Sequence, residues 1–518
     1  MLLAVLLGGV VCFTPLHSLP LPSCRHAAVC PRIAMTSADS ADADAEAALL
    51  PPKDPPVKEL VKFAIPALGL WLSQPLLSLV DTSAVGLSAP AGMGASQLAA
   101  LGPATTFCDG ATYLFAFLNT ATTNLYASAL AADGDTEAVV RRASRVALIC
   151  GTAIVPLLLV FGRSFLGLYV GSAAAANPEL INPATLYVAI RCLSFPAVLL
   201  GSVLQAALLG AKDSLTPLAA IGYATVINVV LDLVLVTKLG WGLAGAALAT
   251  LTAQVISTLV LICQARMKLC PQDGLGLLPY WVERLIHRKH SPPPTTVPTR
   301  KFLVFALPVL TLIVGKIAAY GFLTHAAAGL GSVPLATHQI VLTLFFFLSP
   351  FLEVISQTAQ AFLPGYSAPP DGANKHVWRE SADALGGRLL RYAVCISACA
   401  AFVGGAVPAS GATFLTNDAM VRAAVVPTAL PLAIGVLLTG PLAASEGVLL
   451  ARRQLGFLAG VYVSTVALLP PVLLAVKRRG GTVAQLWTCF AIFQLFRATL
   501  FSGKIWGDKL WQRQQKAE

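Results

Sequence analysis

Long apolar stretches separated by short polar segments dominate the chain. Most of them reach the roughly 20 residues that an α-helix needs to cross a bilayer. The alternation of apolar and polar positions that is typical of membrane β-strands is absent from them. The pattern therefore predicts an all-α integral membrane protein with twelve transmembrane helices. The expected ranges are 63–86, 98–131, 143–170, 184–210, 217–238, 242–265, 302–326, 335–364, 388–408, 424–447, 455–476 and 483–503.

The two halves of the chain resemble each other, which predicts two pseudo-symmetric six-helix lobes. Short motifs recur about 240 residues apart, as expected of an internal repeat: Ala64-Ile65-Pro66 with Ala306-Leu307-Pro308, Leu98-Ala99 with Leu335-Ala336, and Leu209-Gly210-Ala211 with Leu449-Leu450-Ala451. An even number of helices per half makes the repeat parallel, with a cavity between the lobes. We expect a leader and linker (1–57), an N-terminal lobe (58–265), a charged, Pro-rich linker (266–300), a C-terminal lobe (301–506) and a polar tail (507–518).

The Lys and Arg residues fall mainly on one side of the predicted membrane. Segments on the side of the termini hold 24 of them, whereas the opposite loops hold six: Arg163, Lys238, Arg422, Lys477, Arg478 and Arg479. Basic residues accumulate on the cytoplasmic side of membrane proteins. The bias therefore predicts both termini on the cytosol-like side, which in a plastid is the stroma.

Composition agrees with a membrane protein. Hydrophobic residues make up 56% of the 518 residues and charged residues only 11%, against about 25% charged in soluble domains. The net charge of +11 does not indicate nucleic-acid binding, because the basic residues flank apolar spans. The eleven cysteines show neither a disulfide framework nor zinc-site spacing. Nucleotide-binding and metalloprotease motifs are absent, as is a paired nucleophile and base, so we expect neither an enzyme nor a cofactor.

The first 57 residues have the features of a targeting leader. A short apolar run, Leu2 to Phe13, suits a secretory signal. The segment behind it carries Ser and Arg, and no Asp or Glu precedes Asp39. Val11-Cys12-Phe13-Thr14-Pro15 resembles the cleavage site of algal plastid presequences. Two addresses in series predict a plastid membrane. An ordinary secretory signal, leading to the plasma membrane or another endomembrane, is the alternative.

Three polar residues inside spans are candidates for binding a coupling cation, H⁺ or Na⁺. Ionisable groups in a bilayer are costly, and they often mark ion pathways. Asp81 lies late in the first helix. Asn228 and Asp232 are four residues apart on the fifth helix, so their side chains share one face. A structural role, in which these groups only hold helices together by hydrogen bonds, is the alternative.

Other polar positions inside spans are candidates for substrate binding or gating: Asp109, Lys316, Glu353, Gln357 and Glu446. Asp109 could instead be a satisfied contact between helices. Glu446 lies near the cytosol-like end and could pair with Arg452 or Arg453. Lys316 could neutralise one of the carboxylates or attract an anionic substrate.

Several motifs resemble the MATE (multidrug and toxic compound extrusion) family, in matching order over roughly residues 58–506. They are Phe63-Ala64-Ile65-Pro66 with Pro75-Leu76-Leu77-Ser78-Leu79-Val80-Asp81-Thr82 for the first helix, Asn228-Val229-Val230-Leu231-Asp232 for the fifth, and Gly242-Leu243-Ala244-Gly245-Ala246 for the sixth. Further motifs resemble the plastid branch of plant MATE proteins, near the DinF-like subfamily: Ala100-Leu101-Gly102-Pro103, Cys108-Asp109-Gly110, Lys316-Ile317-Ala318, Ser356-Gln357-Thr358-Ala359-Gln360 and Glu446-Gly447-Val448.

The resemblance implies a V-shaped, two-lobed antiporter that exports small organic solutes against H⁺ or Na⁺, and we expect it to act as a monomer. By matching position, Asp81, Asn228 and Asp232 would form the cation site of the N-terminal lobe. The seventh helix carries no carboxylate, unlike that of some family members, which favours H⁺. A lipid-linked precursor flippase of the same architecture is the alternative. It would be expected to carry more basic residues in its cavity, whereas Lys316 and Arg191 are the clear candidates in spans before the last helix.

Overall fold

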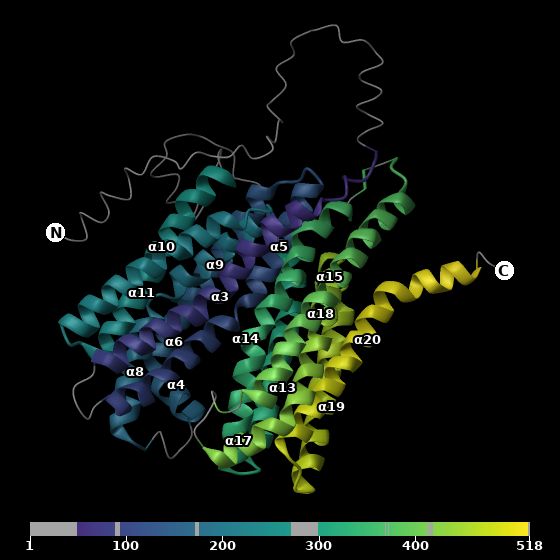
Figure 1. Ribbon diagram of the computed structural model, residues 1–518. Coiled ribbons are helices and arrows are strands. Elements are labelled where there is room, and N and C mark those ends of the chain that lie inside the picture. Colours follow the sequence, from purple (N-terminus) through teal and green to yellow (C-terminus); the bar gives the residue numbers. More distant parts are fainter. Residues whose placement is uncertain are drawn as a thin grey trace, which may run out of the picture. The chain divides into compact units, whose positions relative to one another are not determined.

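The computed structural model describes residues 49–88, 94–170, 176–270, 299–367, 369–370, 372–411, 413 and 418–515. Within these ranges, the side chains of residues 74–76, 78–84, 86–88, 94–99, 299–303 and 508–515 are not described. Every regular element in the described part is a helix (Figure 1). The predicted leader, except for residues 49–57, and most of the predicted linker 266–300 lie outside the described residues.

The first half of the chain forms an N-terminal set of helices. Its elements are α3 (Val57–Ser88), α4 (Gly94–Tyr113), α5 (Ala116–Ala131), α6 (Thr136–Val170), α8 (Pro178–Cys192), α9 (Phe195–Gly210), α10 (Leu215–Asp232), the π-helix η1 (Leu233–Lys238) and α11 (Gly242–Lys268).

The second half forms a C-terminal set of the same kind. Its elements are α13 (Thr299–Ala328), α14 (Ser332–Phe362), the 3₁₀ turn η2 (Leu363–Tyr366), α15 (Lys375–Ser410), α17 (Ala419–Val425), the 3₁₀ turn η3 (Val426–Thr428), α18 (Ala429–Ala451), α19 (Leu455–Arg478) and α20 (Val483–Gln515).

Nine helices in the described part of the chain are long and apolar enough to cross a membrane. The pair α8 and α9, bent by 54°, makes a tenth span. Pro196 explains this bend, because proline lacks the N–H that a continuous helix would need. Helix α3 and the pair α4 and α5 correspond to the first two spans that the apolar pattern predicted. The predicted span 98–131 is thus two helices, and Thr112, which donates to the carbonyl of Cys108, lies in the last turn of α4, before the break.

Polar side chains fix where several helices begin. Asn177 accepts a hydrogen bond from the N–H of Glu179 at the start of α8. Asn374 accepts one from the N–H of His376 at the start of α15. Asp418 accepts bonds from the N–H groups of the second and third residues of α17. Each cap supplies an acceptor for N–H groups that have no partner within the helix.

The two sets share one apolar core, here called the shared core. It joins buried residues of α3, α5, α6 and α9 to buried residues of α13, α14, η2, α15, α18, α19 and α20. Phe63 of α3 meets Phe362 of α14 edge-to-face, with 5.5 Å between the ring centroids. Polar contacts join the same region: the hydroxyl of Tyr366 donates to the carbonyl of Lys53, and Arg388 donates to Asp54.

Toward the other end of the helices, each set has a core of its own. Helix α13 shows this along its length, because its residues 305–313 contribute to the shared core and its residues 319–327 do not. The latter pack with Phe345, Trp487 and Phe490, all from the C-terminal set. The corresponding core of the N-terminal set includes Leu101 and Leu166. The described apolar contact between the sets is therefore concentrated toward the end where α13 begins.

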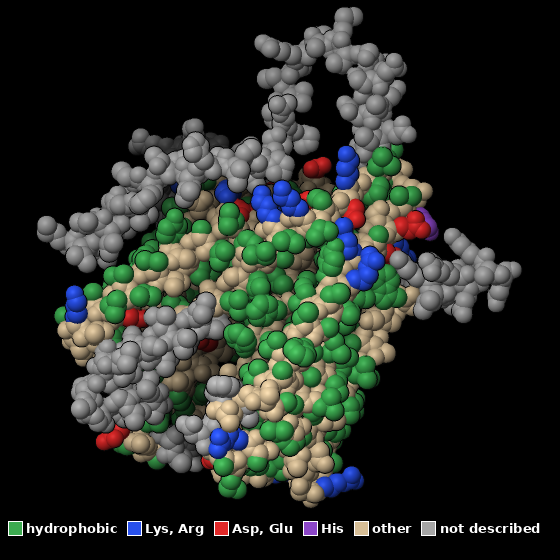
Figure 2. Space-filling view, viewed as in Figure 1, with side chains coloured by type: hydrophobic (Ala, Val, Ile, Leu, Met, Phe, Trp, Pro, Cys, Tyr) green, Lys and Arg blue, Asp and Glu red, His purple; other side chains and the backbone are tan. Residues whose placement is uncertain are grey.

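Basic side chains gather at this same end. In Figure 2 most of the visible Lys and Arg side chains lie along the upper edge of the view, where Figure 1 shows the starts of α3 and α15. The sides of the helices below them are largely apolar, as expected of a surface that faces lipid tails.

Candidate cation and substrate sites

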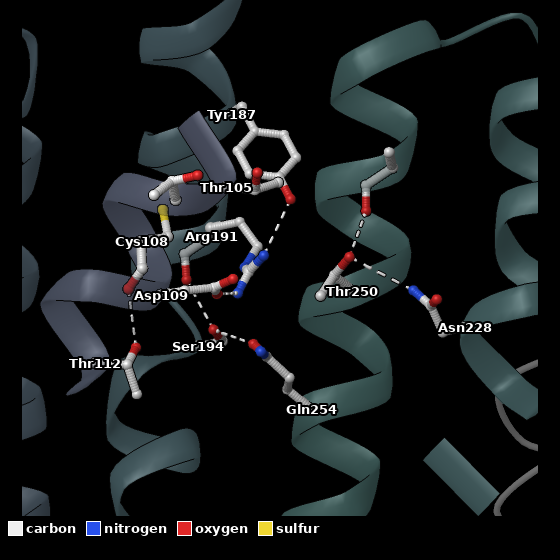
Figure 3. A network of polar contacts seen from close by, with 12 residues as sticks. Thr105, Cys108, Asp109, Thr112, Tyr187, Arg191, Ser194, Asn228, Thr250 and Gln254 are labelled. Carbon is white, nitrogen blue, oxygen red and sulfur yellow. Dashed lines mark hydrogen bonds and ion pairs between the residues drawn. The ribbon is translucent and has the colours of Figure 1, made fainter. Parts of the chain in front are cut away.

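The fifth span carries a buried polar pair. Asn228 and Asp232, on α10, are 0% and 1% exposed. The amide nitrogen of Asn228 donates to the hydroxyl of Thr250 on α11, 3.5 Å away (Figure 3). Thr250 in turn donates to the carbonyl of Ala246, at 2.9 Å. The predicted shared face of Asn228 and Asp232 is therefore buried inside the N-terminal set.

A π-helix begins directly after Asp232, at Leu233. Such turns are uncommon and occur frequently at functional sites, because the additional residue in the turn changes the backbone hydrogen-bond pattern. Helix α3, which carries Asp81, packs against both α10 and η1. The side chain of Asp81 lies outside the described residues. The backbone nevertheless places the three predicted cation-site residues on neighbouring elements.

A second polar network lies in the N-terminal set and centres on Arg191 of α8. Its guanidinium donates to Asp109 of α4, at 3.2 Å, and to the hydroxyl of Tyr187, at 3.0 Å (Figure 3). The side chain of Arg191 is 8% exposed and that of Asp109 is 55% exposed. Nearby, Ser194 donates to Gln254 of α11, at 2.7 Å. Asp109 thus makes a contact between helices and at the same time remains partly open to its surroundings.

The C-terminal set contains a small polar pocket of about 300 Å³, including the space at its mouth. Charged and polar side chains from five helices line it: Lys316 and Tyr320 of α13, Glu353 of α14, Thr439 and Glu446 of α18, Tyr462 of α19, and Gln494 and Arg497 of α20. Tyr113, at the end of α4, is within electrostatic range of Lys316 and of both carboxylates. The pocket is therefore near the N-terminal set as well.

The ammonium of Lys316 joins the two carboxylates of this pocket. It lies 2.8 Å from Oε1 of Glu446 and 3.4 Å from Oε1 of Glu353. The other oxygen of Glu446 accepts a hydrogen bond of 2.6 Å from the hydroxyl of Tyr462. Of the two alternatives for Lys316, the structure has the lysine neutralising carboxylates.

Glu446 does not pair with Arg452 or Arg453, the alternative partners suggested by the sequence. Arg452 forms an ion pair with Asp383 of α15. Glu446 is instead 7% exposed and contacts Lys316 and Tyr462. Sequence position suggested the arginines because they lie within two helical turns, whereas the actual partners come from other helices.

Gln357 lies one turn beyond Glu353 on α14 and is half-buried. It is not among the residues that line the pocket. The neighbouring Gln360 has a clearer position, since its side-chain oxygen accepts a hydrogen bond of 2.9 Å from Asn124 of α5. This bond connects the two sets of helices.

Sequence reasoning missed several members of these networks. Tyr462, Gln494 and Arg497 line the pocket, and Arg497 donates to Gln494. Gln494 and Arg497, three residues apart in an apolar helix, were a recognisable signal, because that spacing places both on one face. The tyrosines gave none, since buried tyrosines are common in apolar spans.

Comparison with known proteins identifies the family of the chain. The MatE family model matches residues 66–234, which extend from α3 into η1. The chain is 32% identical over 448 residues to "Protein DETOXIFICATION 47, chloroplastic" of Arabidopsis thaliana, covering 86% of this chain and 77% of the relative. It is 27% identical to "DNA damage-inducible protein F" of Escherichia coli strain K12, covering 62% of this chain and 66% of that protein.

The fold is similar to that of a solved structure titled "Crystal structure of MATE in complex with MaD3S". The TM-score is 0.70 at 19% identity, with 89% of this chain and 97% of the other covered. The predicted all-α, twelve-helix fold is therefore confirmed. By the extent of its similarity to the Arabidopsis protein and the match to MatE, the chain belongs to the MATE family of multi-pass membrane transporters, which are not enzymes.

Proposed function

We propose that the protein is a secondary active antiporter that exports small organic solutes in exchange for H⁺, with Asp81, Asn228 and Asp232 as its proton site. The observation that carries the proposal is the burial of Asn228 and Asp232 directly before the π-helix. They lie on a helix that packs against α3, which carries Asp81. Carboxylates buried inside a span are costly, and membrane proteins retain them mainly for ion or proton transfer.

Coupling requires the two conformations of the transporter to bind a proton with different affinity. Desolvation favours the protonated form of a carboxylate, whereas water and hydrogen-bond donors favour its charged form. A carboxylate that is dry in one conformation and hydrated in the other therefore couples the proton gradient to the conformational change. In this proposal Asp81 carries the proton, and Asn228 and Asp232 adjust its affinity.

We favour H⁺ over Na⁺ because of the composition of the C-terminal pocket. The seventh span, α13, contributes Lys316 to it and no carboxylate. A sodium site there would have to compete with an ammonium that is already bound to both glutamates. Proton coupling through the N-terminal set needs no second cation.

For location, we propose a plastid membrane. Two observations support it: the leader has the features of a plastid presequence, and the Arabidopsis relative carries the word chloroplastic in its name. We propose that the transporter acts as a monomer and handles small organic molecules; its membership of the MATE family supports the second part of this proposal.

The flippase alternative receives no support from the described residues. It would be expected to present free basic groups to an anionic lipid headgroup. Here three basic side chains within the spans have partners: Arg191 pairs with Asp109, Lys316 with two glutamates, and Arg497 donates to Gln494.

The test is ethidium transport in proteoliposomes with an imposed pH gradient, beside direct ethidium binding in detergent. Asp81→Asn keeps the shape of the side chain but removes its exchangeable proton, so we expect gradient-driven transport to be lost and binding to remain. Asp232→Asn should weaken coupling less. The matched control is Glu380→Gln, since Glu380 is a carboxylate of α15 that is 67% exposed.

If Asp81→Asn transported ethidium at the wild-type rate, the assignment of the proton site would be overturned. Transport driven by a sodium gradient at clamped pH would show that the site binds a different ion. Transport of a lipid-linked precursor without any ethidium transport would favour the flippase.

A further inference from the structure

The pocket of the C-terminal set has the oxygen ligands of a cation site, and a lysine side chain supplies the positive charge. Its lining includes two carboxylates and a hydroxyl from three helices: Glu353 of α14, Glu446 of α18 and Tyr462 of α19. Carboxylate and hydroxyl oxygens are the ligands that hard cations prefer. The ammonium of Lys316 contacts both carboxylates, as a bound cation would.

We propose that Lys316 is a tethered counter-cation that makes the C-terminal set independent of alkali-metal ions. Its ammonium supplies the positive charge that two buried carboxylates require, and the covalent link to α13 prevents its exchange with either side of the membrane. The C-terminal set then has no site for an alkali-metal ion, and this proposal rests on the proposed function only in that the chain is taken to be cation-coupled.

The charges around the cluster support this reading. With Lys316 present, the two glutamates and the lysine carry one net negative charge, and Arg497, which lines the same pocket, balances it. An additional Na⁺ would leave a net positive charge in a mostly buried site, which is unfavourable. The hydroxyl of Tyr462 completes the set by donating to Oε2 of Glu446, whereas the lysine contacts Oε1.

The geometry also explains why the lysine holds its place. Glu446 is 7% exposed, Lys316 is 20% exposed and Glu353 is 29% exposed. Removing one partner of a buried ion pair leaves an uncompensated charge, which is strongly destabilising. If the lysine is replaced by a neutral side chain, the two carboxylates must therefore take up either protons or a soluble cation.

The experiment is equilibrium binding of radiolabelled sodium to the purified, full-length protein in detergent, in mildly alkaline buffer so that carboxylates ionise. We expect the wild type to bind little sodium through this pocket. Lys316→Gln should bind at least about tenfold more sodium, because it leaves two carboxylates without their counter-ion. The matched control is Lys316→Arg, which keeps a positive charge and should resemble the wild type. Lys316→Gln/Glu446→Gln should lose the gained binding, which assigns it to this pocket.

Two results would overturn the proposal. The first is sodium binding by the wild type that Glu446→Gln removes, since it would show a sodium site beside the lysine. The second is a folded Lys316→Gln, judged by size-exclusion profile and thermal transition, that binds no more sodium than the wild type. If Lys316→Gln does not fold, the wild type and Glu446→Gln still provide the first test. None of these measurements depends on transport, so a failure of the proton-antiport proposal would be seen separately.

Discussion

Asn124 of α5 donates a hydrogen bond of 2.9 Å to Gln360 of α14 and thereby connects the two sets of helices through a buried polar contact. Both side chains are buried, at 1% and 6% exposure. The bond lies beside the shared core, which must come apart if this end of the protein opens. A buried amide that loses its partner keeps its desolvation penalty, about 1–3 kcal/mol.

We therefore expect Gln360→Leu to weaken the closure of this end. The measurement is the labelling rate of Ala121→Cys, a shared-core position with 0% exposure, by a membrane-impermeant maleimide in a background without native cysteines. Labelling should be faster in Gln360→Leu than in the control Thr465→Val, whose hydroxyl bonds only within its own helix. Equal rates would show that the amide pair does not hold this end closed.

The ion pair of Asp109 and Arg191 predicts an asymmetric response to mutation. Asp109→Ala leaves a buried guanidinium without its carboxylate and should destabilise the protein by about 1–2 kcal/mol, less than for a fully buried pair because Asp109 is half exposed. Adding Arg191→Met should recover part of the loss. Thermal unfolding of both single variants and the double variant measures the coupling, and strictly additive effects would show that the pair contributes nothing.

Gly447 lies at a close approach between α18 and α14. A Cβ placed there would lie 2.7 Å from both Cα and O of Ser356. Gly447→Ala must therefore push the helices apart, and we expect a loss of about 1–3 kcal/mol in stability. Ethidium transport should fall as well, because Glu446 precedes this residue. Gly456→Ala is the control, since no atom lies within 4 Å of its Cβ position, and similar melting of both variants would contradict the prediction.

Asp213, in the turn between α9 and α10, predicts a pH-dependent contribution to stability. Burial alone would raise the pKa of Asp213, but hydrogen bonds from Lys268 and Thr216 outweigh it, and the pKa is lowered. The Lys268 ammonium is 2.7 Å from its carboxylate. A lowered folded-state pKa means that the stabilisation is present above the unfolded value, about 3.9, and is lost as the pH falls through the folded-state value.

The check is the thermal transition of the wild type and of Asp213→Asn across pH. At neutral pH the wild type should melt at the higher temperature. The difference should shrink as the pH falls below about 4, where the unfolded carboxyl gains its proton. Glu380→Gln, at an exposed site, should show no such dependence. A difference that grows on acidification would reverse the assigned sign.

Much of the fold could be predicted because a helix that crosses lipid must be apolar over about 20 residues. The length of apolar runs located the spans, and the spacing of Asn228 and Asp232 correctly placed both on one helix face. The π-helix that follows Asp232 had no local signal, since residues 233–236 are apolar and compatible with an ordinary helix. Its position depends on packing against α3 and α11.

The partners of Lys316 could not be predicted from the sequence. Glu353 and Glu446 lie 37 and 130 residues away in the sequence, so helical periodicity cannot connect them. The free-energy cost of an ionisable side chain inside the membrane identified each of the three residues as unusual. Only the tertiary structure shows that their charges neutralise one another. The same holds for Glu446, for which the nearby arginines were a reasonable but incorrect alternative.

The shared core has an energetic consequence for alternating access. If the two sets rock apart at the end where α13 begins, Phe63 and Phe362 lose the dry contact that they make here. At about 25 cal/mol per Å², every 100 Å² of apolar surface that is wetted and not replaced would cost about 2.5 kcal/mol. A modest gradient can drive the cycle only if the opposite end covers a nearly equal area as this end opens. At the opposite end, the separate cores of the two sets must therefore present matching apolar faces. Each half-cycle then buries about as much apolar surface on one side of the membrane as it exposes on the other, and the free energy stays almost constant.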